Sequence, residues 1–209
     1  MMGFFINSDQ KPYHGLSCFH LVGLIVTIAI TPIVTGCTGA TLGAGAAVGV
    51  AALEERTIGT VADDTRVAAQ IRLAILDKGA KYSLKIGIEV FEGRALLTGA
   101  VPTEKMRADA VSIAWKISGV KDVLNEIQIS SSDFVDSARD IWISAQLTSR
   151  MAFDEKIHAI NYALETVGGI VYLIGIAQNQ IELDRVINHA RDLKYVRNVI
   201  SHVRIKNPS

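Results

Sequence analysis

The stretch Ala95-Leu96-Leu97-Thr98-Gly99-Ala100-Val101 returns 76 positions later as Val171-Tyr172-Leu173-Ile174-Gly175-Ile176-Ala177. Both stretches are apolar runs with a glycine at the same place, which is typical of a buried strand. The same offset, without a gap, aligns Asp64 with Asp140, Gly93 with Gly169, Ala114 with Ala190, Val123 with Val199 and Ile129 with Ile205. A register held over about 65 residues predicts two copies of one structural unit. We call the copies repeat one (residues 56–130) and repeat two (residues 137–209).

The spacing of apolar residues predicts the order helix, strand, strand, helix, strand in each copy. In repeat one, Val67, Ile71 and Ile75 recur at helical spacing after Asp63 and Asp64, which are placed to cap the helix. A hairpin of Lys85–Val90 and Arg94–Val101, a helix from Pro102 to Gly119 and a strand from Val123 to Ile129 follow. The matching elements of repeat two are a helix from about Ile141, a hairpin turning at Gly168-Gly169, a helix over Gln180–Leu193 and a strand over Val199–Ile205. A small three-stranded mixed sheet with two helices on one face is an α+β sandwich.

Gly99 and Gly175 occupy equivalent places near the end of the second strand. A glycine inside a strand marks a bulge or a close approach that leaves no room for a side chain. We therefore predict that both are structural glycines.

The composition excludes several classes of function. The 209-residue chain contains 21 Lys and Arg against 21 Asp and Glu, so no overall field draws it toward nucleic acid. No nucleophile–histidine–acid set, phosphate-binding loop or paired cysteines appear, and His158, His189 and His202 are isolated, which disfavours a metal site. The sequence predicts a protein that is not an enzyme and that uses no cofactor.

Residues 1–36 have the architecture of a secretory signal peptide. Met1–His20 is polar, Leu21–Val34 is largely apolar, and small residues precede Cys37. About 14 apolar residues are too few to span a bilayer as a permanent helix. The end of this segment resembles the bacterial lipobox, in which the cysteine is lipidated and becomes the first residue. We therefore predict that Cys37 is lipidated; the alternative is an uncleaved anchor with a chance cysteine.

Residues 37–55 are predicted to form a lipidated Gly/Ala tether. Lipoproteins of this type carry two or three acyl chains, such as palmitate, and two chains suffice for stable anchoring. Because Cys18 lies in the removed segment, the mature chain keeps a single cysteine and forms no internal disulfide. Thr38 stands where an aspartate would favour retention in the inner membrane, which favours the outer membrane.

The first helices of the two copies differ on one face. Arg66 of repeat one becomes Trp142 in repeat two, and Asp77 becomes Phe153. On a continuous helix four residues share the face that gains the aromatic rings: Trp142, Gln146, Ser149 and Phe153. Amphipathic rings of this kind favour the headgroup level of a bilayer, so this face is a candidate lipid-binding surface.

Arg139 and Arg150 are close enough in sequence to contact lipid phosphates beside this face. The alternative interpretation is that Trp142 and Phe153 pack against repeat one, together with Phe134 of the linker. Several further cations gather in the last third of the chain and are typical of a solvated helix face: Arg185, Arg191, Lys194, Arg197, Arg204 and Lys206. The alternative is a second surface for phosphate or for a partner.

The two units resemble BON domains. The residues that carry the resemblance are Arg56-Thr57-Ile58-Gly59-Thr60 with Asp63-Asp64, Val123-Leu124-Asn125-Glu126-Ile127, and Asp140-Ile141-Trp142-Ile143. With the lipobox and the Gly/Ala tract, the arrangement is similar to that of outer-membrane lipoproteins with two BON domains. The resemblance implies two tandem α+β domains of order αββαβ, at residues 56–130 and 137–209, joined by a linker at 131–136.

The same resemblance implies a lipid-anchored protein of the outer membrane that faces the periplasm. It implies binding of anionic phospholipid through the second domain and support of envelope integrity. The alternative function is that of an assembly or chaperone-like factor that contacts the outer-membrane protein assembly machinery. Neither interpretation involves nucleic acid.

Overall fold

The computed structural model describes residues 54–80, 84–130 and 137–206. Both repeats belong to one compact unit, Gly43–Ser209. The predicted signal peptide, Cys37, the predicted tether as far as residue 53, and the predicted linker lie outside the described residues.

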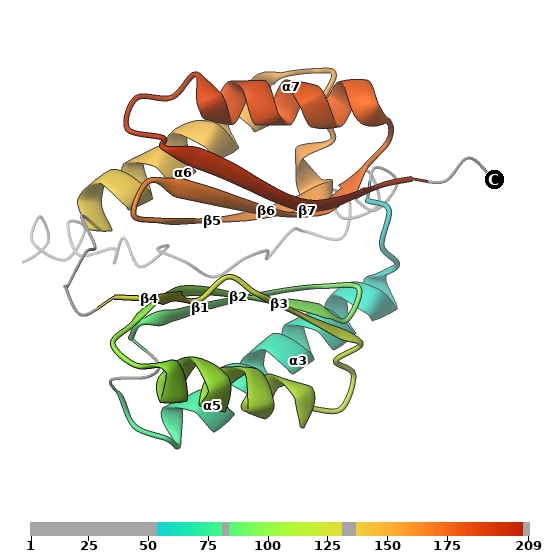
Figure 1. Cartoon of the computed structure of the whole chain (residues 1–209). Coiled ribbons are helices and arrows are strands. Elements are labelled where there is room, and N and C mark those ends of the chain that lie inside the picture. Colours follow the sequence, from blue (N-terminus) through green and yellow to red (C-terminus); the bar gives the residue numbers. More distant parts are fainter. Residues whose placement is uncertain (1–53, 81–83, 131–136, 207–209) are drawn as a thin grey trace, which may run out of the picture. The chain divides into compact units, whose positions relative to one another are not determined.

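Repeat one has the predicted order of elements (Figure 1). They are α3 (Ile58–Leu76), β1 (Ile86–Phe91), β2 (Arg94–Val101), α5 (Glu104–Trp115), β3 (Asp122–Asn125) and β4 (Gln128–Ile129). Strand β1 is antiparallel to β2, whereas β3 and β4 both run parallel to β2. The third strand, predicted as one piece, is split because the Asn125 side chain accepts a hydrogen bond from the backbone N–H of Ile127 (3.2 Å) and turns the chain locally.

Repeat two folds in the same way. Its elements are α6 (Ser137–Phe153), the 3₁₀ turn η1 (Ala159–Asn161), β5 (Tyr162–Val167), β6 (Ile170–Ala177), α7 (Gln180–Arg191) and β7 (Asn198–Ile205). Strand β6 pairs antiparallel with β5 and parallel with β7, which gives a three-stranded mixed sheet. The predicted α+β fold of order αββαβ is confirmed in both repeats.

The first helices begin earlier than the sequence predicts. Helix α3 starts at Ile58, because the hydroxyl of Thr57 accepts a hydrogen bond from the backbone N–H of Thr60 (3.1 Å). The prediction that Asp63 and Asp64 cap this helix is therefore wrong, and Asp64 lies inside it with a buried side chain. Helix α6 starts at Ser137 instead of Ile141.

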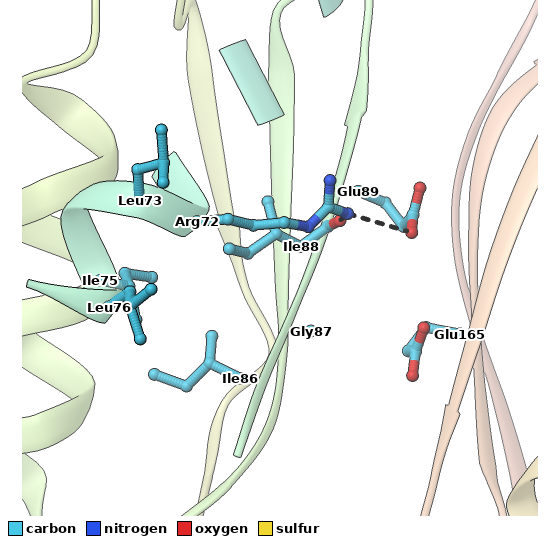
Figure 2. A pocket seen from close by; sticks show the side chains of 9 residues that line it. All are labelled: Arg72, Leu73, Ile75, Leu76, Ile86, Gly87, Ile88, Glu89 and Glu165. Atoms are coloured by element: carbon cyan, nitrogen blue, oxygen red, sulfur yellow. Dashed lines mark hydrogen bonds and ion pairs between the residues drawn. The ribbon is translucent and has the colours of Figure 1, made fainter. Parts of the chain in front are cut away.

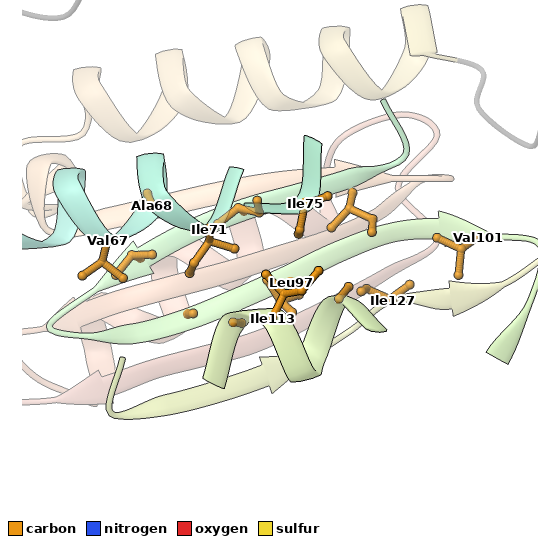
Figure 3. Close-up of a cluster of buried hydrophobic side chains, with 14 of the residues drawn as sticks. Val67, Ala68, Ile71, Ile75, Leu97, Val101, Ile113 and Ile127 are labelled. Carbon is orange, nitrogen blue, oxygen red and sulfur yellow. The ribbon is translucent and has the colours of Figure 1, made fainter. Parts of the chain in front are cut away.

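Each repeat has its own core between its helices and one face of its sheet, and Figure 3 shows the core of repeat one. In repeat one, Val67, Ile71 and Ile75 of α3 pack with Leu97 of β2 and Ile113 of α5. The equivalent stripe of α6 is also buried: Ile143, Leu147 and Met151. The predicted apolar stripes of both first helices are thus confirmed.

The sheet faces that the helices leave uncovered are buried in a third cluster. Phe91 and Leu96 of repeat one share it with Tyr172, Ile174 and Ile176 of repeat two. The Tyr172 hydroxyl accepts a hydrogen bond from the side-chain amide of Gln128 (2.8 Å). Glu126 and His202, which occupy equivalent positions in the two repeats, meet at 2.8 Å. The two copies therefore pack sheet against sheet.

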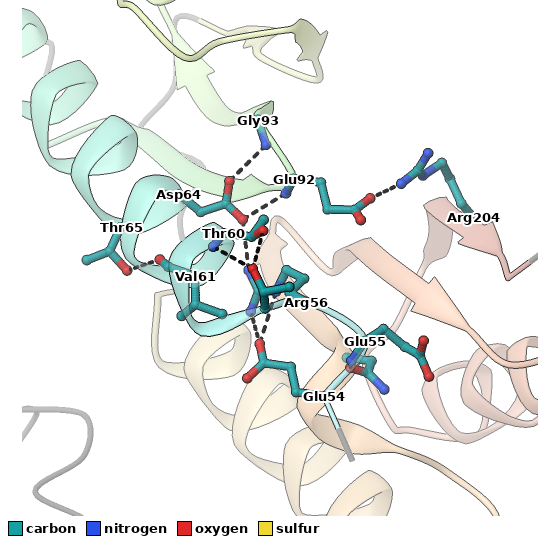
Figure 4. A network of polar contacts seen from close by, with 12 residues as sticks. Glu54, Glu55, Arg56, Thr60, Val61, Asp64, Thr65, Glu92, Gly93 and Arg204 are labelled. Atoms are coloured by element: carbon teal, nitrogen blue, oxygen red, sulfur yellow. Dashed lines mark hydrogen bonds and ion pairs between the residues drawn. The ribbon is translucent and has the colours of Figure 1, made fainter. Parts of the chain in front are cut away.

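The chain before α3 is fixed on both repeats, and Figure 4 shows its residues Glu54, Glu55 and Arg56. The backbone N–H of Glu55 donates to the side chain of Asn161 (2.8 Å), and Lys206 pairs with the Glu55 carboxylate (2.9 Å). Hydrogen bonds from Lys206 and Gln178 lower the pKa of Glu55. Arg56 pairs with Asp64 of α3 (3.1 Å). Glu54 and Glu55, assigned by sequence to the tether, are thus held in place.

The two strand glycines lie where the backbone of another segment approaches closely. A β-carbon on Gly99 would come within 2.0 Å of the Lys85 carbonyl oxygen, and one on Gly175 within 2.1 Å of the Asn161 carbonyl oxygen. In each case this carbonyl belongs to the residue just before the first strand of the hairpin. No other residue type fits these positions without moving the backbone.

Two equivalent carboxylates lie at the seam between the repeats (Figure 2). Glu89 of β1 and Glu165 of β5 are half-buried there, and Arg72 of α3 approaches Glu89 at 3.9 Å. Burial raises the pKa of Glu165, and repulsion from Asp140 adds to the effect. Burial also raises the pKa of Glu89, to which the charge of Glu165 adds. One arginine thus stands beside two carboxylates whose charged forms are disfavoured.

Replacing Glu165 should therefore change how stability depends on pH. Because the pKa of Glu165 is higher in the folded than in the unfolded chain, the free energy of unfolding increases as the pH falls through the raised pKa. We expect Glu165→Gln to melt at pH 7 at the wild-type temperature or above. Between pH 7 and pH 5 the wild type should gain stability relative to the variant in scanning calorimetry.

The exposed Glu155 supplies a matched control, since Glu155→Gln makes the same substitution at a carboxylate outside the seam. A lower melting temperature for Glu165→Gln at pH 7, with an unchanged dependence on pH, would contradict the assignment.

Candidate functional site

A buried carboxylate holds the first helix of each repeat on the turn of its hairpin. In repeat two, Asp140 of α6 accepts hydrogen bonds from the backbone N–H groups of Gly168 (2.7 Å) and Gly169 (2.8 Å). In repeat one, Asp64 accepts the equivalent pair from Glu92 and Gly93, each at 2.8 Å (Figure 4). We call this contact the aspartate clamp.

The clamp of repeat two also brings the segment before β7 to the start of α6. The carbonyl of Gly169 accepts a hydrogen bond from the backbone N–H of Arg197 (2.7 Å). Tyr195 is therefore next to the helix, and its ring meets that of Trp142 edge to face at 6.0 Å between centroids and 76° between planes. Aromatic pairs favour this arrangement.

Tyr195 has a backbone conformation that glycine usually occupies. Its φ angle is 73°, and the equivalent residue of repeat one is Gly119 with φ 102°. A residue with a side chain loses about 1–2 kcal/mol in the left-handed region. Repeat two thus holds an aromatic ring at a strained position, where repeat one has no side chain.

Two cations lie against the same ring. The guanidinium carbon of Arg139 is 5.1 Å from the centre of the Tyr195 ring, and the Lys194 ammonium nitrogen is 4.7 Å from it. Both distances are within the range of a cation–π contact. Trp142 and Tyr195 nevertheless remain 41% and 44% exposed. We call Arg139, Trp142, Lys194 and Tyr195 the aromatic patch.

The rest of the predicted face continues along α6. Gln146 and Ser149 are exposed, and Phe153 at the end of the helix is 86% exposed. From Ile141 to Ser149 the helix contains no charged residue, and Ile141 is exposed as well. The result is an uncharged helix surface with aromatic rings at both ends.

The two predicted arginines behave differently. Arg139 joins the aromatic patch, whereas Arg150 donates to the carbonyl of His189 on α7 (3.4 Å). The alternative, that Trp142 and Phe153 pack against repeat one, is not what the structure shows. The ring partner of Trp142 is Tyr195 of repeat two, and Phe153 is largely exposed.

A charged groove of about 530 Å³ adjoins Phe153. Asp154 lies in it and contacts His189 (2.8 Å) and Arg185 (3.3 Å). The hydrogen bond with His189 is the main cause of the lowered pKa of Asp154. The charged side chains at this end of α6 therefore pair largely with one another.

The described residues contain neither a metal-binding cluster of His, Cys, Asp or Glu nor a helix long and apolar enough to cross a membrane. The histidines that the sequence left isolated have acidic neighbours: His189 contacts Asp154, His202 contacts Glu126, and His158 lies 3.5 Å from Glu182.

Sequence reasoning missed Tyr195 and took Lys194 for part of a solvated face. The same offset places Tyr195 opposite Gly119, and a tyrosine where the sister copy has a turn glycine is the signal that would have identified it.

Removing the clamp should destabilise the protein strongly. Asp140→Ala leaves two turn N–H groups without their acceptor, and hydrogen bonds to a charged group contribute about 1.5–3 kcal/mol each. We expect urea denaturation to show a loss of roughly 3 kcal/mol or more. The sister variant Asp64→Ala should lose a comparable amount, and a loss below about 1 kcal/mol for both would show that the clamp is dispensable.

Two substitutions at Tyr195 separate backbone strain from ring contacts. Tyr195→Ala loses the ring but keeps the strain, whereas Tyr195→Gly loses both. The glycine variant should therefore unfold with a free energy about 1 kcal/mol higher than the alanine variant. Equal values in thermal denaturation would mean that the conformation of Tyr195 is not strained.

The comparisons with known proteins agree with the fold. The pattern of the BON domain family matches residues 63–131 and 139–207. The chain is 42% identical over 147 residues to the "uncharacterized protein in gshII 5′ region" of Anaplasma centrale, which covers 69% of this chain and 96% of that protein. It is 29% identical over 160 residues to the outer membrane lipoprotein DolP of Haemophilus influenzae, covering 75% and 83%. It is 22% identical over 152 residues to the osmotically-inducible protein Y of Escherichia coli, covering 71% and 76%. The chain therefore belongs to the BON domain family and carries one BON domain in each repeat.

Proposed function

We propose that this protein is a non-catalytic, lipid-anchored protein of the outer membrane that faces the periplasm, binds anionic phospholipid through its second BON domain and supports envelope integrity. The observation that carries the proposal is the aromatic patch at the start of α6. It combines two half-exposed rings with two cations, next to an uncharged helix surface.

The chemistry of the patch suits the boundary between headgroups and acyl chains. Tryptophan and tyrosine place an apolar ring in the acyl region while their polar atoms stay in water. Arg139 and Lys194 extend the patch with positive charge, which attracts anionic headgroups by about 1 kcal/mol per cation near the surface. Burying Trp142 and Phe153 would add roughly 3 kcal/mol or more.

The first BON domain has a different surface at the equivalent place. Arg66 replaces the tryptophan and Gly119 replaces the tyrosine. Arg66 is engaged with Gln70 (3.0 Å) on its own helix. The difference between the copies supports membrane contact through the second domain alone.

The predicted lipid anchor is compatible with this orientation. The chain enters the described structure at Glu54 and Glu55, which lie near Asn161 and Gln178. These residues are at the end of the sheet opposite the hairpin turn and the patch, about 26 Å away along the eight residues of β6. An extended chain from Cys37 to Glu55 reaches up to about 60 Å, so anchor and patch can engage one bilayer together. The outer membrane lipoprotein DolP of Haemophilus influenzae supports the assignment of compartment.

Co-sedimentation with vesicles tests the proposal directly. The compact unit Gly43–Ser209, which lacks the anchor, should bind vesicles that contain phosphatidylglycerol and bind neutral phosphatidylcholine vesicles weakly. Trp142→Ala should weaken binding about tenfold or more, since each tenfold corresponds to about 1.4 kcal/mol. Tyr195→Gly, which relieves the backbone strain while it removes the ring, should also weaken binding.

Trp115 provides the matched control, because it is the other tryptophan of the chain and is exposed on α5 of the first BON domain. Trp115→Ala should bind like the wild type. If the wild type fails to bind anionic vesicles, the lipid proposal is wrong, and the assembly factor that contacts outer-membrane protein machinery becomes the leading function.

A further inference from the structure

Strand β5 is the free edge of the second sheet, and its hydrogen-bonding direction follows from the register. Gly169 comes just before β6, and Ala177 is its last residue. The carbonyls of both accept hydrogen bonds from the β7 side, and both residues have odd numbers. The backbone N–H and C=O groups of the even-numbered residues of β6 therefore point toward β5. Their hydrogen-bonding partners on β5 are Ala163, Glu165 and Val167. The backbone groups of Leu164 and Thr166 point away from the sheet.

The first BON domain covers its equivalent edge. By the same register the backbone N–H and C=O groups of Ile88 in β1 point away from the sheet. The Ile88 carbonyl accepts a hydrogen bond from the Arg72 guanidinium of α3 at 2.5 Å. Figure 2 shows Arg72 extended from the helix over this strand. An arginine that occupies an edge carbonyl and adds charge there protects the strand against pairing with another chain.

The second BON domain lacks this protection. The residue equivalent to Arg72 is Thr148, and the residue equivalent to Ile88 is Leu164. A threonine side chain is too short to span from α6 to the strand edge. Among the residues that the structure describes, none donates to the Leu164 carbonyl or accepts from its N–H. The edge of β5 is therefore open where the edge of β1 is closed.

A groove runs along this open edge. It has a volume of about 680 Å³ and is bounded by α6, β5 and Glu89 of the first BON domain. Small side chains line its α6 side: Ser144, Ala145, Thr148, Ser149 and Ala152. A volume of this size accommodates several residues of an extended chain that lies beside Leu164 and Thr166.

The two faces of an added strand would meet different chemistry. Side chains alternate across a strand, so those opposite Leu164 point toward α6 and its small, largely apolar lining. The side chains on the other face of the added strand point toward the seam, where Glu165 and Glu89 lie near Arg72. Apolar side chains fit the first face, and positively charged side chains complement the second.

We propose that the open edge of β5 binds an extended segment of another polypeptide, as an added strand in which apolar and basic residues alternate. Main-chain hydrogen bonds to Leu164 and Thr166 supply the register, and the groove and the two glutamates supply the preference for side chains. This binding uses the β5 side of α6 and not the aromatic patch, and of the predicted lipid-binding face the groove includes Ser149 alone.

The chain itself offers the substitutions that test this idea. Thr148→Arg installs in the second domain the residue that closes the edge of the first, and Arg72→Thr opens the first. The probe is a seven-residue peptide in which valine and lysine alternate, with a peptide of alternating valine and glutamate as control. Binding to the full chain in detergent is measured by fluorescence anisotropy, and the contact site by the amide NMR shifts of Leu164 and Thr166.

We expect the lysine peptide to bind the wild type and to shift both amides, and Thr148→Arg to weaken binding at least tenfold. Arg72→Thr should create a second site, detected at Ile88, and Trp142→Ala should bind the peptide like the wild type. Equal binding of the glutamate peptide, or unchanged binding by Thr148→Arg, would overturn the proposal. Binding that appears only when the chain starts at Glu54 would assign the edge to the preceding segment of the same chain and would also overturn it.

Discussion

The aspartate clamp is the contact on which the arrangement of each BON domain depends. One buried carboxylate accepts both N–H groups of the hairpin turn, and so fixes the first helix relative to the sheet. In the second domain Trp142 comes two residues after the clamping Asp140, and the same turn holds Arg197. The aspartate clamp therefore sets the distance between Trp142 and Tyr195, although neither ring takes part in it.

The duplicated domains share their interior and differ on their surfaces. Asp64 and Asp140, Gly99 and Gly175, and the buried stripes of α3 and α6 perform the same tasks in both copies. The exposed side of the first helix has diverged instead. Arg66 corresponds to Trp142, and Arg72 corresponds to Thr148. Without these two arginines the second domain has an uncharged helix surface and an open strand edge, and the first domain has neither.

Much of the fold could be predicted from the sequence, because the repeat and the apolar periods report local geometry and burial. The stripes of Val67, Ile71 and Ile75 and the order of strands are of this kind. The role of Asp64 could not be predicted in this way. An acidic residue near the start of an apolar period looks like a cap, whereas its partners are turn amides 28 and 29 residues away. The sheet-on-sheet seam is likewise a tertiary feature that no local pattern encodes.

The candidate site was predicted in part for the same reason. The helical period identified which residues share the exposed face of α6, because a helix fixes their directions. The helical period could not identify Tyr195, which lies in the loop after α7. It also could not predict that the Arg150 side chain donates to the carbonyl of His189. Both depend on how α7 and the loop pack beside α6.

The most direct test of membrane contact through the second BON domain is the depth of Trp142 in a bilayer. Trp115→Phe leaves Trp142 as the single tryptophan, and lipids brominated at different acyl positions quench a tryptophan according to its depth. We expect strong quenching of Trp142 in anionic vesicles by bromine near the headgroup and weak quenching by bromine near the bilayer centre. Absence of quenching at every depth, or equal quenching of Trp115 in the Trp142→Phe chain, would contradict this expectation.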